Sequence, residues 1–184
     1  MSEPRASEAG FSLLEVLVAI VVLSTVAAGL AGLFALAAMA TRSARSQTLA
    51  TLIAMDKIEQ LRGLMWSFDA NGAAVSDTTS DLSTRPTASA GQGLRPSPPD
   101  SLQRNTIGYV DYLDDAGQWT GTGAQPAPGA VFIRRWNIQP LPADPVNTLI
   151  FQVLVRTVAG GAGGAGGRRP GDAMLTSVRT RKAS

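Results

Sequence analysis

The chain has 184 residues, with 16 Lys and Arg against 14 Asp and Glu, and contains neither cysteine nor histidine. These absences exclude disulfides, thiolate zinc sites and imidazole, the usual general base near neutral pH. A net charge of +2 is too small to indicate nucleic-acid binding by itself. Because no nucleotide-binding loop, catalytic triad or paired-carboxylate motif is found either, we predict a protein that is not an enzyme and has no cofactor.

The N-terminal part of the sequence is dominated by one apolar run. From Val16 to Thr41 there is no charged residue, and Leu, Val, Ile and Ala predominate. About 20 apolar residues are enough for a helix to cross the hydrocarbon core, so the run predicts a transmembrane helix. A secretory signal peptide, leaving a soluble protein that begins at Thr41, is the alternative. The leader carries Arg5 against Glu3 and Glu8, whereas signal peptides begin with positive charge.

Glu15 interrupts this run within the stretch GFSLLEVLVAI. A carboxylate in lipid is costly unless it finds a partner, and a plain single-pass anchor leaves Glu15 unexplained. If the chain is cut after Gly10, Phe11 becomes the N-terminus and its α-amine is a cation. Glu15 then follows four residues later on the same helix face. The amine that pairs with Glu15 could belong to the same chain or to a neighbouring copy.

The segment Gly10-Phe11-Ser12-Leu13-Leu14-Glu15, followed by a long apolar helix, resembles the prepilin motif of type IV pilins and type II secretion pseudopilins. The resemblance implies that a membrane peptidase cuts between Gly10 and Phe11 and that Phe11 is then N-methylated. It also implies that Glu15 pairs with the N-terminal amine of an adjacent subunit. Ala9 and the acidic leader depart from the family, in which a basic residue often precedes the glycine.

After Thr41 the sequence TRSARSQTLATLIAMDKIEQLRGLMW keeps helix formers and contains no proline. Apolar residues recur at spacings of three and four, at Leu49, Leu52, Ile53, Ile58, Leu61, Leu64 and Met65. Charged and polar residues fill the other side, namely Asp56, Lys57, Glu59, Gln60 and Arg62. The pattern predicts that the helix becomes amphipathic over residues 42–66, packs on another layer and ends near Gly63.

The second half of the chain carries strand signals after a stretch, residues 69–101, that we expect to be a loop because turn formers dominate it. Four runs are rich in β-forming residues, namely 107–113, 131–138, 148–158 and 173–181. We expect Pro140, Pro142 and Pro145 to separate the second and third strands, and the glycine-rich stretch 159–167 to form the loop of a C-terminal hairpin. The predicted fold class is α+β, with one long N-terminal helix packed on a small antiparallel sheet of three to four strands. Pilins have this architecture as well.

Two clusters of charged residues are candidate ligand sites. Asp111, Asp114 and Asp115 supply the oxygen ligands that calcium prefers, although a hydrophilic hairpin turn accounts for the same residues. A basic cluster near the C-terminus is a candidate for DNA or another anionic surface and consists of Arg168, Arg169, Arg179, Arg181 and Lys182. We favour a solvated hairpin here, because no aromatic residues alternate with these arginines along the sequence. Trp66, Trp119 and Trp136 are expected in the core.

The family resemblance implies a function for the whole chain. The segments KIEQLRGLMW, RRW and LTSVRTRK resemble minor pilins of the PilV type, which implies a subunit of a type IV pilus with roles in twitching motility and cell adhesion. Residues 1–10 would be the leader, 11–41 the transmembrane and assembly helix, 42–66 its amphipathic half, and 67–184 a globular periplasmic domain. The implied location is the bacterial inner membrane, followed by incorporation into the extracellular pilus.

The same resemblance implies several partners, namely other major and minor pilins, the prepilin peptidase and methyltransferase, the inner-membrane assembly platform and the lipid bilayer. Nucleic acid would be a further partner only if the basic cluster near the C-terminus binds DNA. Two alternatives stay open. One is a minor pseudopilin of a type II secretion system, which shares every N-terminal feature, and the other is a membrane-anchored receptor for DNA or a surface.

Overall fold

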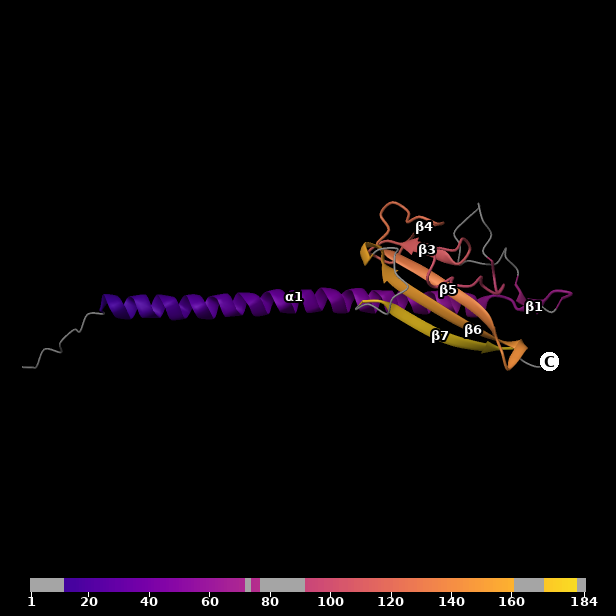
Figure 1. The fold of residues 1–184 in the computed structure, drawn as a ribbon, viewed down its shortest axis with the longest axis horizontal. Helices are drawn as coiled ribbons and strands as arrows, with labels where there is room; N and C mark the ends of the chain where they lie inside the picture. Colours follow the sequence, from indigo (N-terminus) through magenta and orange to yellow (C-terminus); the bar gives the residue numbers. More distant parts are fainter. Residues whose placement is uncertain (1–11, 72–73, 77–91, 161–170, 182–184) are drawn as a thin grey trace, which may run out of the picture. The chain divides into compact units, whose positions relative to one another are not determined.

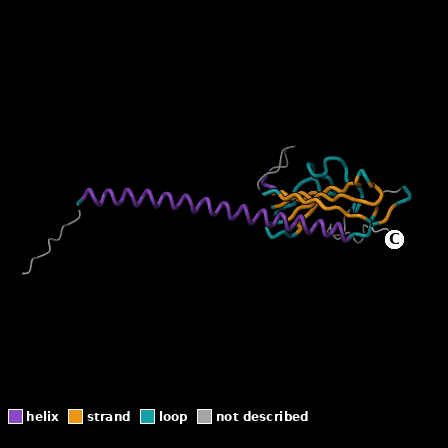
Figure 2. Tube along the Cα trace, turned by 90° about the horizontal axis from the view of Figure 1, so that it is seen from below, coloured by secondary structure: helices purple, strands orange, loops and turns teal. Residues whose placement is uncertain are grey.

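The computed structural model describes residues 12–71, 74–76, 92–160 and 171–181. The chain divides into two compact units, Met1–Arg42 and Ser43–Ser184. Helix α1 runs over 51 residues, Leu13–Gly63, and ends where the glycine near the end of the amphipathic pattern predicted. The other elements belong to the second unit and are β1 (Ser67–Phe68), β2 (Ala74–Val75), β3 (Val110–Leu113), β4 (Trp119–Thr122), β5 (Phe132–Leu141), β6 (Asp144–Thr157), η1 (Val158–Gly160) and β7 (Ala173–Thr180) (Figures 1 and 2).

The main sheet has the strand order β4-β3-β5-β6-β7, and all neighbouring strands are antiparallel. This arrangement, with one long helix and one antiparallel sheet, confirms the predicted α+β class. The sheet has five strands in the described residues, so the expected three to four was too few. The additional strand is β4, whose sequence WTGT is only four residues long and contains a glycine. Its Trp and Thr residues favour strands, but four residues interrupted by a glycine give too short a signal, and the segment forms a strand by pairing with β3.

Several strand boundaries differ from the sequence-based expectation. The first predicted strand begins at Val110 rather than at residue 107, because Gly108 has a φ of +86° and the Tyr109 amide donates to the Thr106 carbonyl in a turn. The stretch 69–101, expected to be a loop, contains β2, which pairs with β1. Residues 72–73 and 77–91 of this stretch lie outside the described part of the chain.

Of the three prolines that we expected to separate β5 from β6, only Pro142 lies between the two strands. The two strands form one long hairpin that includes Pro140 in β5 and Pro145 in β6. Only Pro142 and Ala143 lie between the strands, and the register shifts between Pro140 and Leu141. Proline is tolerated here because it lies at the end of the hairpin and beside an irregularity, where a ladder hydrogen bond is not required.

The core of the second unit lies between one face of the sheet and the amphipathic part of α1. Small or branched residues on α1 meet large side chains from alternate positions of β5 and β6, namely Trp136, Ile138, Phe151, Val153 and Val155. The helix side consists of Ala50, Ile53, Ala54, Ile58, Leu61 and Leu64. The predicted stripe was therefore wrong at Leu52 and Met65, which are exposed, and it omitted two alanines. The alanines lie at the same helical spacing and allow the sheet to approach the helix closely.

Lys57 is the largest departure from the predicted helix pattern, because it lies on the buried face and is 0% exposed. Its Nζ is 3.4 Å from the centroid of the Trp136 ring and 3.8 Å from Asp111 Oδ2. A cation over an aromatic ring is stabilised by the ring's quadrupole, and the carboxylate supplies the opposite charge. The spacing of apolar residues placed Lys57 on the polar side of the helix. That local pattern contains no information about Trp136 and Asp111, which come from distant strands.

Arg134 connects the sheet to the helix at the same place. Its Nε and Nη2 donate to the two carboxylate oxygens of Asp111, at 2.9 and 2.8 Å. Its Nη1 donates to the Ile53 carbonyl and to Asp56 Oδ2, both at 3.1 Å. Burial lowers the pKa of Arg134, but Asp111 and then Asp56 raise it, and the net direction is upward. The guanidinium is therefore fully charged and joins strands β3 and β5 to α1.

We predict that Asp111→Ala destabilises the second unit strongly, because Arg134 and Lys57 would remain buried without their shared carboxylate. The expected loss in free energy of unfolding is about 3–5 kcal/mol, measured by urea titration of the full chain in detergent with tryptophan fluorescence. Asp56→Ala is the matched control, because the Asp56 side chain is 60% exposed, and it should cost less than about 1 kcal/mol. Equal losses in the two variants would contradict the central role of Asp111.

Candidate functional site

The start of helix α1 is defined by a side-chain cap. Ser12 precedes the first helical residue, and its Oγ accepts a hydrogen bond from the Glu15 amide at 3.2 Å. The Ser12 carbonyl accepts from the same amide at 3.0 Å and from the Val16 amide at 3.2 Å. Ser12 and Glu15 therefore have the S-x-x-E spacing of a capping box. This spacing is present in the sequence, so a helix start at Ser12 is predictable from Ser12 and Glu15 alone.

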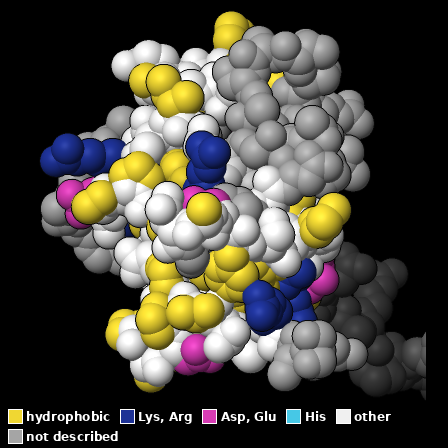
Figure 3. All heavy atoms as spheres, turned by 90° about the vertical axis from the view of Figure 1, so that its right-hand side faces the viewer, with side chains coloured by type: hydrophobic (Ala, Val, Ile, Leu, Met, Phe, Trp, Pro, Cys, Tyr) yellow, Lys and Arg dark blue, Asp and Glu magenta, His cyan; other side chains and the backbone are white. Residues whose placement is uncertain are grey.

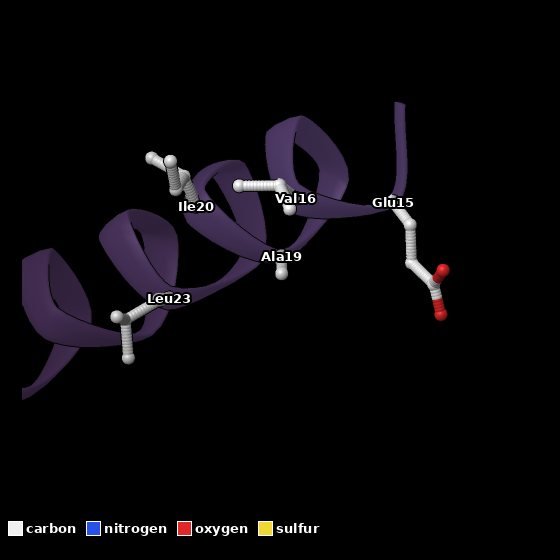
Figure 4. A pocket seen from close by; sticks show the side chains of 5 residues that line it. All are labelled: Glu15, Val16, Ala19, Ile20 and Leu23. Atoms are coloured by element: carbon white, nitrogen blue, oxygen red, sulfur yellow. The ribbon is translucent and has the colours of Figure 1, made fainter. Parts of the chain in front are cut away.

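The Glu15 carboxylate projects away from the axis of α1 (Figure 4). It lies at one end of an open groove whose other lining residues are Val16, Ala19, Ile20 and Leu23. Among the described residues, no Lys or Arg lies within 4.0 Å of Glu15. A carboxylate in the first turn is favoured by the helix dipole, but in an apolar environment it also requires a cation, and none of the residues that the structure describes supplies one. The site thus presents one negative charge at the edge of an apolar surface.

The apolar part of α1 is exposed along its whole length in this chain. Its large residues from Leu13 to Met39 are among the exposed hydrophobic residues. The hydroxyls of Ser24, Thr25 and Thr41 donate to the carbonyls four residues earlier, so their polar groups are satisfied within the helix. In the part of the chain that the structure describes, α1 is the one helix long and apolar enough to cross a membrane. A helix with internally satisfied polar groups meets the requirement of the lipid interior.

Gly10 and Phe11, the predicted processing site, lie outside the described residues. The pairing of Glu15 with the Phe11 amine therefore stays a prediction.

The three aspartates considered for calcium do not form one site. Asp111 is fully buried and its two oxygens contact Arg134, so it is not part of the acidic turn. Asp114 accepts the amide hydrogens of Ala116 and Gln118 at 2.9 and 2.8 Å, which is the hydrogen bonding of a turn, and Asp115 is exposed. Within the described ranges, no group of three or more acidic residues is placed to hold a metal ion. Asp111 lies within β3, whereas Asp114 and Asp115 belong to the turn that follows the strand.

The basic C-terminal cluster also divides. Arg179 Nη1 donates to the carbonyls of Leu61 and Leu64, at 3.4 and 2.8 Å, and so satisfies the last turn of α1. Burial lowers the pKa of Arg179, and the nearby Arg62 lowers it further. Arg181 is exposed, and its guanidinium carbon lies 4.9 Å from the centroid of the Phe68 ring. Arg168, Arg169 and Lys182 lie outside the described residues.

The expectation that tryptophans lie in the core holds fully for Trp136, which is 2% exposed. Trp66 is partly buried and packs against the core from the segment after α1. Trp119 is half-buried in the edge strand β4. The sequence does not distinguish these three environments, because each depends on what other strands place beside the ring.

A comparison with known families supports the class of protein that the start of α1 indicates. The model of the prokaryotic N-terminal methylation motif matches residues 5–31, which include Ser12, Glu15 and the first turns of α1. The match supports a prepilin-type protein, that is, a pilin or a pseudopilin. Together with the apolar helix, the motif fits an inner-membrane anchor and implies processing by a peptidase and association with pilins. No curated protein and no solved structure matches the chain.

We predict that Ser12→Ala loosens the first turn of α1, because the Glu15 amide loses its side-chain acceptor. The expected cost is about 1 kcal/mol, seen as faster hydrogen exchange at the Glu15 amide of the full chain in detergent micelles. Ser12→Asp should preserve protection, since an aspartate accepts the same hydrogen bond. Ser24→Ala is the control, because Ser24 bonds within an intact helix and should leave the first turn unchanged. Unaltered exchange in Ser12→Ala would show that the cap contributes nothing.

Proposed function

We propose that the chain is a minor pilin, a structural subunit of a type IV pilus. In this proposal the chain is cut after Gly10, the new N-terminal Phe11 is methylated, and the subunit is incorporated into the pilus or primes its assembly. The observation that carries the proposal is Glu15, an exposed carboxylate at the start of an exposed apolar helix and inside the methylation motif. The fold, with one helix packed on an antiparallel sheet, is the architecture expected of such a subunit.

The physical basis is the cost of Glu15 in lipid. A carboxylate within the apolar region costs about 2–3 kcal/mol, and less near the interface. The cut after Gly10 would create an amine that offsets this cost when it approaches the carboxylate. The Glu15 carboxylate projects away from the axis of α1, where another subunit could reach it. We assign the partner amine to Phe11 of a neighbouring subunit, as the prepilin resemblance implies, so that pairing favours assembly.

The proposal also assigns a place to each part of the chain. Residues 1–10 form the leader, residues 11–41 cross the inner membrane, and residues 42–66 pack on the sheet. Residues 67–184 form the periplasmic domain and are carried into the pilus. The partners are other major and minor pilins, the prepilin peptidase and methyltransferase, the assembly platform and the bilayer.

We predict that the mature chain begins at Phe11 and carries one N-terminal methyl group when the prepilin peptidase is present. Mass spectrometry of the protein from membranes should show this N-terminus, and a strain lacking the peptidase should retain the leader. Gly10→Leu is expected to block the cut, because the larger side chain replaces the residue before the scissile bond. An intact Met1 in the peptidase-positive strain, or a start at Thr41, would contradict the proposal.

We predict that Glu15→Gln is processed and inserted normally but is incorporated into pili poorly, because the amide removes the charge that attracts the amine. The measurement is the ratio of the chain in sheared pili to the chain in membranes. Glu59→Gln is the matched control, since Glu59 is 73% exposed on the same helix and contacts only Arg62, at 3.9 Å, among the described ion pairs. Equal incorporation of Glu15→Gln and wild type would show that the charge is dispensable. Normal pili with a loss of protein secretion would instead favour a type II pseudopilin.

A further inference from the structure

Strand β7 forms one edge of the main sheet, and its free side pairs with no other described strand (Figure 1). Thr180 lies opposite Thr148 of β6, and the Arg181 amide donates to the Asn147 carbonyl at 2.8 Å. In an antiparallel pair, residues whose backbone groups point to the partner strand alternate with residues whose groups point away. The odd-numbered residues of β7 therefore bond to β6, and the even-numbered ones, from Met174 to Thr180, direct their N–H and C=O groups to the free side.

The free edge of β7 has few of the features that keep a strand from pairing with another chain. The strand is eight residues long, contains no proline and pairs with β6 without a register shift. Its one charged residue, Arg179, donates to the Leu61 and Leu64 carbonyls at the end of α1. Proteins usually protect such edges with short strands, bulges, prolines or exposed charges. A long and regular edge therefore indicates a site at which another strand is added.

The opposite edge of the main sheet is protected. Strand β4 has only four residues and includes Gly121, and its pairing with β3 shifts register between Tyr112 and Leu113. A short and irregular edge aligns few backbone groups with an incoming strand. Of the two edges of the main sheet, β7 is thus the one that offers a regular row of donors and acceptors.

The side chains along β7 define what an added strand would contact. On the face of the sheet away from α1, Met174 and Val178 are 36% and 53% exposed. Val178 lies opposite the half-buried Ile150 of β6, and Thr176 is exposed between the two apolar residues of β7. Cross-strand pairs of β-branched and other apolar side chains stabilise neighbouring strands. A strand with apolar side chains at alternate positions would therefore cover Met174 and Val178.

The end of this edge is basic. Arg181 is exposed after the last residue of β7, and Arg62, exposed at the end of α1, is close enough to Arg179 to lower its pKa. Among the described residues, no carboxylate lies within 4.0 Å of Arg179 or Arg181. Figure 3 shows Lys and Arg side chains beside hydrophobic ones at this end of the unit. An added strand that runs antiparallel to β7 begins here, so an acidic residue near its N-terminus would meet these charges.

A second copy of the chain fits this edge poorly. Antiparallel pairing of two β7 strands would relate the copies by a two-fold axis, which reverses the direction of every element. Ser43, where the second unit begins, would then lie at opposite ends of the pair. Two copies anchored in one membrane by their apolar runs enter their second units from the same side, which disfavours this pairing. The β4 edge of a copy is too short to pair with the whole of β7.

We propose that the free edge of β7 binds an extended segment of a different protein as an additional antiparallel strand. The segment contains no proline over about five residues, carries apolar β-branched side chains over Met174 and Val178, and has a carboxylate near its N-terminal end beside Arg181. Backbone hydrogen bonds supply the affinity, and the side chains supply the selectivity. The site is distinct from the surface around Glu15 and does not depend on the proposed function.

A synthetic peptide tests this site in the full chain in detergent micelles. The probe is a fluorescein-labelled peptide of about eight residues, in which a glutamate is followed by alternating valine and threonine. We expect saturable binding by fluorescence anisotropy, above the background of empty micelles, and slower hydrogen exchange at the Thr176 and Val178 amides. Moving the glutamate to the C-terminal end of the peptide should weaken binding, because the carboxylate then lies far from Arg181.

Thr176→Pro removes one N–H from the free side of β7 but no donor to β6, and it should weaken peptide binding about tenfold. Thr176→Val is the matched control, because it keeps the amide and should bind like wild type. Near-UV circular dichroism of each variant confirms that the fold is retained. Peptides methylated at alternate amide nitrogens leave the protein unchanged. Methylation of the amides that face β7 should abolish binding, and methylation of the other set should not.

Several results would overturn the proposal. Absence of peptide binding, equal loss with both methylated peptides, or equal affinity of wild type and Thr176→Pro excludes strand addition at this edge. Self-association of the chain without peptide, measured by light scattering and lost in Thr176→Pro, assigns the edge to a second copy instead. Each result is independent of the cut after Gly10, so the proposed function and this site can fail separately.

Discussion

The bidentate contact between Arg134 and Asp111 is the interaction on which the second unit depends. Asp111 receives both donors of Arg134 and the charge of Lys57, and Arg134 also bonds to the Ile53 carbonyl on α1. Buried charges are tolerated only when each has its partner, so the network forms as a whole or imposes a large penalty. The network therefore connects β3, β5 and the second part of α1 at fixed positions. The side chains of Trp136 and its apolar neighbours then fill the core between the sheet and α1.

Helix α1 is one continuous helix whose first part is apolar and exposed and whose second part has a buried face. Its second part has a buried face that is made of small and branched residues and contains the Lys57 ammonium group. Its first part has no such face, and its hydroxyls bond only to its own carbonyls. The capped first turn presents Glu15 at a fixed place on that apolar surface. A single charge so placed has little effect in water and a large one in lipid, which is the physical basis of the proposed pairing with an amine.

Arginine has a different role at each of three places in the fold. Arg134 is buried and joins helix to sheet, Arg179 is half-buried and satisfies the carbonyls at the end of α1, and Arg181 is exposed over Phe68. The difference comes from the environment, since burial without a carboxylate lowers the pKa of Arg179 while Asp111 raises that of Arg134. In the sequence, Arg179 and Arg181 fall in one basic cluster near the C-terminus, for which we favoured a solvated hairpin over an anionic-ligand surface. The structure separates them.

Local patterns in the sequence determined the features that depend on neighbouring residues. The long apolar run, the motif around Glu15, the end of α1 at Gly63 and three of the main strands follow from composition and spacing, because helices and strong strands are specified by residues close in the chain. The tertiary structure alone decided the burial of Lys57, the isolation of Asp111 from the acidic turn, the strand β4 and the meeting of Arg181 with Phe68. Each of these depends on a partner many residues away. A charged side chain is stable in the core only when that partner is present, so no local pattern could predict it.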